Sequence, residues 1–368
     1  MRITRVTTDH LRVPTGKPAR IPLAGGRHAP DAADLVLVHL ETDAGLTGLG
    51  FTYLVGPGAA AVRSLIDTEV SHLVVGEDPR DTDRLFAKAE ARSRGVGFGG
   101  LAARAYTAID VGLWDAKAKA AGVPLFRLLG GARPAAPFFV SDLAPAGRDA
   151  AEVLKAAKPL VKQGAMGLRV EVGAGEVQAD ADRVRAISDG LGDDSWVGVA
   201  ADGRFDLGTA QALAHFFEDV GIDWFEDPIP GADEPGYRTL AGLMDVPLAV
   251  GSGFDTREQF FRVIRDGVVR TVRPDVCRLG GITPLLKVAA VAEAFHVAVS
   301  PARLPEVGVH LACGLGVVPH VDSVSWFADV FAGGPTVEGG KLVPPAGPGL
   351  GLSVADGAAR FRVGEPGA

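Results

Sequence analysis

The chain has 368 residues, a formal net charge of −8 and 47% hydrophobic residues. This length and composition predict one large α/β domain with a smaller companion. The charges form no long basic or acidic run, so we expect neither nucleic acid nor a membrane surface as a partner. No apolar run reaches the roughly 20 residues of a spanning helix, no signal-peptide pattern is present, and two cysteines give no disulfide framework. We therefore expect a cytoplasmic protein that acts on a small molecule.

The N-terminal region has the pattern of an α+β module. The segments "MRITRVTTDHLRV" and "ADLVLVHLETDAG" alternate apolar and polar residues on either side of a loop from Gly16 to Pro30. This alternation predicts half-buried antiparallel strands. From Gly58 to Gly122 the apolar residues follow a helical period, which predicts helices packed on those strands.

Short β-branched runs then alternate with amphipathic segments. Ala200 to Glu226 and Glu226 to Ser252 each span 26 residues, about one βα unit. Such a repeat predicts parallel strands in a closed (β/α)₈ barrel, with the chemistry at the carboxyl ends of the strands. An open doubly wound sheet is the weaker alternative, because no GxGxxG turn follows the first strand. The eight candidate strands are "PFFVSD", "MGLRVEVG", "SWVGVAA", "IDWFED", "VPLAVG", "VVRTVRP", "FHVAVSPA" and "HVDSVSW".

The C-terminal segment "LVPPAGPGLGLSVADGAARFRV" is rich in proline and glycine and ends in a strand-like run. We expect it to return to the first module. The predicted organisation is a capping domain at 1–132, a barrel domain at 133–328 and a returning tail at 329–368.

One long stretch points to a known family. "AIDVGLWDAKAKAAGVPLFRLLGG" (108–131) resembles the segment joining cap to barrel in the mandelate racemase and muconate lactonizing branch of the enolase superfamily. "LETDAGLTGLG", "WFEDPIP", "RPDVCRLGGIT" and "PGLGL" also have counterparts there. The resemblance covers nearly the whole chain and implies a modified (β/α)₈ barrel with an N-terminal α+β capping domain. It also implies a homo-oligomer.

The resemblance implies particular residues at the strand ends: a Lys-x-Lys base motif, three acidic magnesium ligands, an Asp-His dyad and a late acidic residue. Two of the three ligand carboxylates are absent here, so we expect no cofactor. Magnesium held by Glu226 and Asp202 stays open as an alternative. The motif reads Arg169 and Glu171, the ligand positions read Ala200, Glu226 and Ser252, the dyad reads Asp275 and Ala302, and the late acidic residue is Asp322.

Without a divalent ion, five carboxylates would crowd one barrel mouth. Like-charge repulsion and desolvation raise the pKa of some carboxyl groups in such a cluster, which suits acid and base catalysis near neutral pH. We expect Glu171 or Asp275 to act as the base and Asp322 or Asp202 as the acid. The fifth carboxylate, Glu226, is expected to contact the substrate.

A cation at the same mouth is expected to bind the substrate. Arg169 lies on the strand of Glu171, and a guanidinium group can bind a carboxylate in bidentate fashion. The alternative is that Arg169 and Glu171 form a salt bridge that fills a pocket without catalytic activity. Asp227, which directly follows Glu226 in the sequence, is expected to cap the turn at Pro228. Further substrate contacts are predicted for Ser252, Arg303, His28 in the loop 16–30, and Tyr53 in the apolar loop "FTYLVGPG".

These residues predict an isomerase or lyase that transfers protons on a small carboxylate-bearing molecule, without the usual magnesium site. Two alternatives stay open. Loss of the lysine base and the dyad histidine favours a catalytically silent relative that binds a small ligand. Displaced ligands favour a magnesium-dependent racemase or dehydratase.

Overall fold

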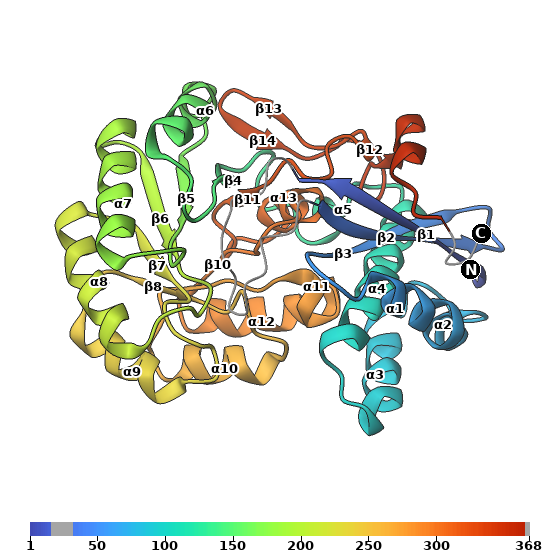
Figure 1. Ribbon diagram of the computed structural model, residues 1–368. Coiled ribbons are helices and arrows are strands. Elements are labelled where there is room, and N and C mark those ends of the chain that lie inside the picture. Colours follow the sequence, from blue (N-terminus) through green and yellow to red (C-terminus); the bar gives the residue numbers. More distant parts are fainter. Residues whose placement is uncertain (16–31, 365–368) are drawn as a thin grey trace.

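The computed structural model describes residues 1–15 and 32–364 and contains a barrel and a cap (Figure 1). The predicted loop 16–30, with His28, lies outside the described residues. Within the described ranges, no helix is both long and apolar enough to cross a membrane.

The cap begins with three antiparallel strands, as the alternating pattern predicts. These are β1 (Ile3–Pro14), β2 (Ala32–Thr42) and β3 (Thr47–Leu54). The prediction of a loop at 51–58 is wrong for its first half, because residues 51–54 complete β3 and pair with β2. A side chain at Gly50 would place its Cβ 1.8 Å from the Ala108 carbonyl oxygen, so glycine is required for the following helices to pack against the sheet.

Helices cover one face of this sheet (Figure 1). The longest, α4 (Gly100–Ala120), packs between the sheet and the barrel and is buried along most of its length. This double burial explains why its apolar residues are not confined to one face. The other helical segments of the cap are α1 (Ala59–Leu65), η1 (Ile66–Val70), α2 (Ser71–Val74), α3 (Thr82–Arg92) and η2 (Ser93–Gly95).

Buried hydrogen bonds join α4 to the barrel. Both carboxylate oxygens of Asp110 accept from Thr283, one from its backbone N–H at 2.9 Å and one from its hydroxyl at 2.6 Å. The indole N–H of Trp114 donates to the Thr283 hydroxyl oxygen at 2.9 Å. These bonds fix the cap on the barrel helix α12 (Ile282–Ala294), and the Thr107 hydroxyl adds bonds to the carbonyls of Val276 and Cys277 in α11 (Val276–Leu279).

The barrel domain contains all eight predicted strands, and they pair in parallel. Their order is β10-β9-β8-β7-β6-β5-β4-β11, which is sequential except for β11, which returns beside β4. This sheet curls into the modified (β/α)₈ barrel, so the fold prediction is confirmed (Figure 1). The strands are β4 (Phe138–Ala144), β5 (Gly167–Glu171), β6 (Trp196–Ala200), β7 (Trp224–Glu226), β8 (Leu248–Val250), β9 (Thr271–Val272), β10 (Ala298–Val299) and β11 (Val321–Ser323).

Helices between the strands form the outer layer (Figure 1). Each places its apolar face against the sheet, and the carboxyl ends of the strands stay open to the loops that follow them. Besides α11 and α12, the helices of this half are α5 (Leu125–Leu128), α6 (Ala150–Lys162), α7 (Val177–Leu191), α8 (Leu207–Val220), α9 (Glu234–Leu243), α10 (Arg257–Arg265) and α13 (Pro305–Gly314).

The C-terminal segment contacts the cap at its end. Arg362 forms an antiparallel bridge with Leu11 of β1, and the Val363 N–H donates to the His10 carbonyl at 2.9 Å. The exact domain boundaries at 132 and 328 stay predictions. The segment contains β12 (Phe331–Ala332), the hairpin β13 (Thr336–Glu338) with β14 (Lys341–Val343), β15 (Ser353–Val354) and η3 (Asp356–Phe361).

Candidate active site

Parallel pairing brings the polar residues of three strands to one edge of the barrel. Glu171 at the end of β5 pairs in register with Ala200 of β6, which in turn pairs with Glu226 of β7. Arg169 lies two residues before Glu171 and therefore faces the same side of the sheet. Asp202 follows Ala200 by two residues, just past the end of its strand. The predicted grouping of these residues at one barrel mouth is therefore present.

Arg169 is the centre of this group and is only 2% exposed. Its Nε and Nη2 donate to the two carboxylate oxygens of Glu226 at 3.0 and 3.1 Å. Nη1 donates to Glu171 at 2.9 Å, and Nη2 donates to Asp202 at 2.9 Å. Burial alone would lower the pKa of Arg169, but the three carboxylates raise it well above its usual value. Arg169 is therefore a permanent cation, and its donors are directed at protein carboxylates.

A second buried guanidinium group lies on the other side of Glu226. Arg273, just past β9, places its Nε 3.2 Å from Glu226 Oε2, as an ion pair without hydrogen-bond geometry. Its Nη2 donates to Asp322 at 2.6 Å, and its Nη1 donates to the Ser300 hydroxyl at 2.8 Å. Arg273 lies only two residues before Asp275 in the sequence. Its observed partners are instead Glu226, Asp322 and Ser300.

Asp322 is 1% exposed and belongs to this buried group. It accepts from Arg273, from the Ser141 hydroxyl and from the backbone N–H of Arg303. Burial alone would raise the pKa of Asp322, but Arg273 and Ser141 lower it below the usual range. An ionised, buried carboxylate has no proton to give at neutral pH, which argues against the predicted role of Asp322 as the acid.

Asp202 is more accessible than Glu171, Glu226 and Asp322, with a side chain that is 27% exposed. Besides Arg169, it binds Arg204 Nη2 at 3.1 Å. Burial would raise the pKa of Asp202, but Arg169, Arg303 and Arg204 together lower it. Its backbone has a φ of 48°, in the left-handed region that non-glycine residues rarely adopt.

Asp275 and Tyr53 meet at the joint between cap and barrel. The Tyr53 hydroxyl donates to Asp275 at 2.8 Å, and Asp275 also accepts from the Cys277 N–H at the start of α11. Asp275 is 2% exposed and Tyr53 is 3% exposed. Their polar atoms are used in holding β3 on α11, so the structure favours a joint-forming role over the predicted base and substrate contact.

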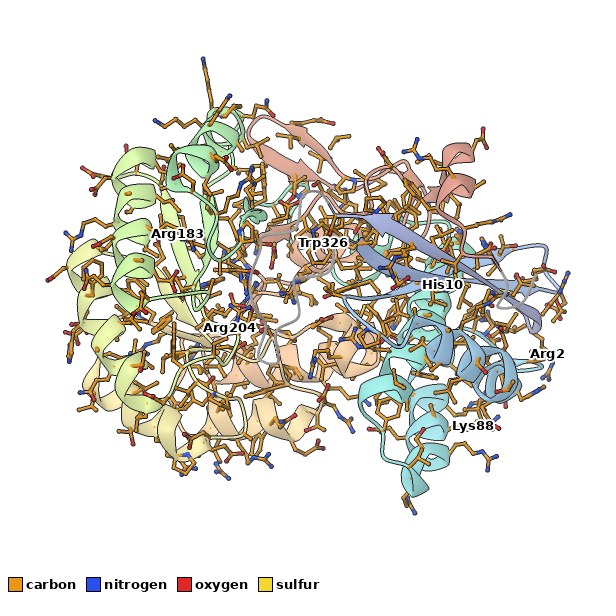
Figure 2. All side chains as sticks on the ribbon, in the orientation of Figure 1. Arg2, His10, Lys88, Arg183, Arg204 and Trp326 are labelled. Carbon is orange, nitrogen blue, oxygen red and sulfur yellow. The ribbon has the colours of Figure 1, made fainter. Side chains whose placement is uncertain are left out.

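A cleft of about 540 Å³ opens beside the charged group. Figure 2 labels two neighbours of cleft-lining residues: Arg204, which binds Asp202, and Trp326, which lies beside Arg303. Both lie in the region between the barrel helices and the cap. Four polar side chains of the mouth line the cleft: Asp202, Asp227, Ser252 and Arg303. The remaining lining residues are Gly203, Ile229, Pro230, Gly231, Ala232, Gly253, Phe254, Gln259 and Arg278.

Arg303 differs from the other cations of the mouth. Its guanidinium lies 5.9 Å from the Trp326 ring centroid, and its backbone N–H binds Asp322. Among residues 1–15 and 32–364, no side chain forms a hydrogen bond or ion pair with the Arg303 guanidinium. Arg278, by contrast, donates to Asp255 and to the Gly253 carbonyl. Arg303 also has a left-handed backbone, with a φ of 58°.

Asp227 has hydrogen-bond partners that the sequence did not predict. Instead of capping the turn at Pro228, it accepts from Gly251 N at 2.8 Å, Ser252 N at 2.9 Å and Ser252 Oγ at 2.5 Å. Burial and the charge of Glu226 raise the pKa of Asp227 to about 6. Its partners lie 24 and 25 residues along the chain, so no local sequence signal identifies them.

Comparisons with known proteins match both halves of the chain. A model described as "Mandelate racemase / muconate lactonizing enzyme, N-terminal domain" matches residues 7–130, and "Enolase C-terminal domain-like" matches 152–358. L-talarate/galactarate dehydratase of Salmonella typhimurium is 28% identical over 91% of this chain and 84% of its own length. The 3,6-anhydro-alpha-L-galactonate cycloisomerase of Streptomyces coelicolor is 30% identical over 86% of each chain.

Solved structures of such relatives contain magnesium. L-talarate dehydratase from Polaromonas sp. JS666, complexed with Mg and L-glucarate, is 30% identical with a TM-score of 0.92, over 99% of this chain and 98% of its own. The Salmonella enzyme, liganded with Mg and L-lyxarohydroxamate, has a TM-score of 0.93 at 27% identity, over 98% of this chain and 93% of its own. These structures contradict our expectation of no cofactor, and that prediction is wrong.

The carboxylates of this chain are arranged unlike a magnesium site. Glu226 is the one carboxylate at the three expected ligand positions, and Arg169 binds both of its oxygens. In the described part of the chain, no group of three His, Cys, Asp or Glu side chains lies as a metal site requires. As they lie, these residues do not fit the ion that the solved relatives hold.

Proposed function

Because the chain belongs to the mandelate racemase and muconate lactonizing enzyme family of the enolase superfamily, we propose that it is a lyase that dehydrates a sugar acid. Relatives that support this reaction include dehydratases of talarate, galactarate, arabinonate, gluconate and galactonate. Their agreement favours a dehydratase over a silent binder. The 30% identical Streptomyces protein makes cycloisomerisation the second candidate. The homo-oligomer that the family resemblance implies stays a prediction.

The guanidinium of Arg303, with which no described side chain forms a hydrogen bond or ion pair, is the observation that carries this proposal. Among the residues that the structure describes, Arg303 is the cleft-lining arginine whose guanidinium has no hydrogen-bonding side-chain partner. A guanidinium group with free donors binds a carboxylate in bidentate fashion. We therefore assign the substrate carboxylate to Arg303 rather than to Arg169, because the donors of Arg169 already bind three protein carboxylates.

Glu171 is the proposed base. Its side chain is 18% exposed, and Arg169 is the side chain that binds it. Asp275 and Asp322 are 2% and 1% exposed, and both are committed to buried hydrogen bonds. Asp202 has a lowered pKa and is therefore a weaker base. Glu171 is not itself one of the residues that line the cleft, but it binds the same guanidinium group, that of Arg169, as the cleft-lining Asp202.

The proton balance of a dehydration can be met by one carboxylate. Glu171 takes the proton from the carbon next to the substrate carboxylate, and the negative charge moves onto the oxygens that Arg303 holds. The bond between the next carbon and its hydroxyl then breaks. Glu171 returns its proton to the departing oxygen, which leaves as water, and the remaining enol tautomerises to a 2-oxo acid.

Magnesium belongs in the assays of this proposal, because solved relatives hold it. When bound, such an ion supplies positive charge to an enolate oxygen. The steps above use only side chains of this chain, since its carboxylates do not fit the ion as they lie.

The test is formation of a 2-oxo acid from a panel of galactonate, gluconate, arabinonate, galactarate and talarate, with magnesium and with EDTA. Wild-type protein is expected to convert at least one acid. Arg303→Ala is expected to lose kcat/KM by roughly 30-fold or more, as expected for a lost charged hydrogen-bonding pair, and Arg303→Lys to recover part of it.

Arg94→Ala is the matched control, because Arg94 is exposed on the cap. It is expected to match the wild type. Absence of any 2-oxo acid across the panel, or an Arg303→Ala variant as active as wild type, would overturn the proposal. A cyclised product without a 2-oxo acid would replace dehydration by the second candidate.

A further inference from the structure

The ends of β7 and β8 are joined by a short, closed set of hydrogen bonds. Asp227 Oδ1 accepts from Gly251 N at 2.8 Å, and Oδ2 accepts from both Ser252 N at 2.9 Å and Ser252 Oγ at 2.5 Å. Asp227 is 5% exposed and Ser252 is 9% exposed, yet both line the cleft. This pair lies outside the Arg169 group, and the reaction proposed above does not use it.

The backbone just past the ends of β7 and β8 has positive φ angles that make this contact possible. Asp227 has a φ of 40°, a strained conformation for a non-glycine residue that persists only where surrounding bonds hold it. Gly251 has a φ of 121°, and a Cβ there would lie 2.4 Å from the Phe260 ring. The turn before Ser252 therefore requires glycine. Two backbone N–H bonds fix the carboxylate, so the position of the Ser252 hydroxyl follows from the fold.

The direction of the hydroxyl hydrogen decides what Ser252 can offer a ligand. A serine hydroxyl has one hydrogen and two lone pairs, and an ionised carboxylate can only accept. With its hydrogen donated to Asp227, Ser252 Oγ has only lone pairs left for the cleft. It can accept a hydrogen bond from a ligand but cannot donate one.

A ligand hydroxyl satisfies this acceptor, whereas a methylene group does not. A ligand that lacks a hydroxyl at this point would bury the Ser252 oxygen without a donor, and an unsatisfied buried polar group is disfavoured. Arg303 lines the same cleft and can bind a carboxylate. The cleft thus presents a cation for an acid group and an oriented acceptor for a hydroxyl group.

We propose that Asp227 orients Ser252 so that Ser252 selects substrates with a hydroxyl group at one defined position along the sugar-acid chain. Asp227 is a positioning residue in this arrangement, and Ser252 makes the contact. The inference rests on the proposed function for the class of ligand.

The test is calorimetric binding at pH 8, which needs no turnover. The probes are the five acids of the panel and the series of mono-deoxy analogues of the acid that binds most tightly. Wild-type protein is expected to bind one analogue at least tenfold more weakly than the parent acid. Ser252→Ala is expected to bring that pair of affinities within about threefold, because the acceptor is gone.

Asp227→Asn keeps the size of the side chain but adds an N–H₂ donor. It is expected to free the Ser252 hydrogen and to reduce the same preference, while affinities for the other analogues change little. Ser64→Ala, on the exposed surface of α1, is the control and is expected to keep the wild-type pattern. Thermal unfolding of each variant shows whether it is folded.

The outcomes separate the two proposals. Binding with selection but no 2-oxo acid overturns the proposed function and leaves the selection rule supported. Wild-type affinities within threefold for every mono-deoxy analogue overturn the rule, as does a Ser252→Ala protein that keeps the preference. If none of the acids binds, both proposals fall.

Discussion

Two parts of the barrel mouth handle charge in opposite ways. Across β5, β6, β7 and β9, Arg169 and Arg273 bind the surrounding carboxylates, and each of these side chains has a partner. Across the loops after β7, β8 and β10, Arg303 and Ser252 face the cleft with binding capacity left over. We infer that the two guanidinium groups of the first part hold the barrel in shape, that Glu171 at its edge is the proposed base, and that the second part contacts the ligand. Removal of a guanidinium group from the first part should therefore lower the free energy of unfolding. Removal of a side chain from the second part should weaken ligand binding.

The largest expected effect comes from Arg273. Arg273→Met leaves Glu226 with one guanidinium partner and Asp322 without its ion pair, and breaking a buried pair typically costs about 3–5 kcal/mol. Chemical denaturation is expected to show a loss of this size in the free energy of unfolding. Arg238→Met is the control, because it removes a surface ion pair with Asp266 and is expected to change stability little. Similar effects of the two variants would contradict a shape-holding role for Arg273.

The next effect concerns magnesium. Arg169→Ala removes the guanidinium from Glu171, Asp202 and Glu226, and three freed carboxylates attract a hard divalent cation. Calorimetric titration is expected to show magnesium affinity at least about tenfold above that of the wild type. Arg204→Ala takes a positive charge from the same mouth but leaves Glu226 paired, and a smaller gain is expected. Equal affinities in wild type and both variants would show that Arg169 does not compete for these oxygens.

The smallest effect is a pH dependence at the joint between cap and barrel. Burial raises the pKa of Asp110 to about 7, above the usual value for an unfolded chain. The folded state thus holds this proton more tightly, so its contribution to stability is full below about pH 4 and is lost as the pH rises to about 7.

Unfolding free energies measured between pH 4 and pH 8 should therefore fall more steeply for wild type than for Asp110→Asn. The difference in slope is at most about 1.4 kcal/mol per pH unit. Asp189→Asn, at an exposed site, should follow the wild type. Parallel curves for wild type and Asp110→Asn would contradict the raised pKa.

The fold was largely predictable because its signals are local. Short β-branched runs at a spacing of 26 residues, such as Glu226 to Ser252, require no knowledge of distant contacts. The family resemblance implied that Arg169, Glu171, Asp202 and Glu226 lie at one end of the barrel, and the structure brings these four together.

The roles within the site depend on competition among neighbours, which sequence does not record. Glu226 could accept from a metal or from arginine, and the three-dimensional reach of Arg169 and Arg273 decides the outcome. Tyr53 lies in a strand rather than a loop because Phe51 to Leu54 pair with β2. Asp227 finds Ser252 only because β7 and β8 are neighbours in the barrel.

Conversion of a bound acid in deuterated water tests the central claim most directly. Wild-type protein incubated in deuterated water with magnesium and the acid that binds most tightly should form a 2-oxo acid that carries deuterium at the carbon next to the carbonyl (C3), because the enol takes up solvent deuterium there, as followed by proton NMR. Glu171→Gln should lose this conversion by about 10²–10⁴-fold, the usual contribution of a positioned base. The exposed Glu176→Gln control should convert the acid like the wild type. Conversion that persists in Glu171→Gln, or that wild type fails to show with any acid of the panel, would contradict the account.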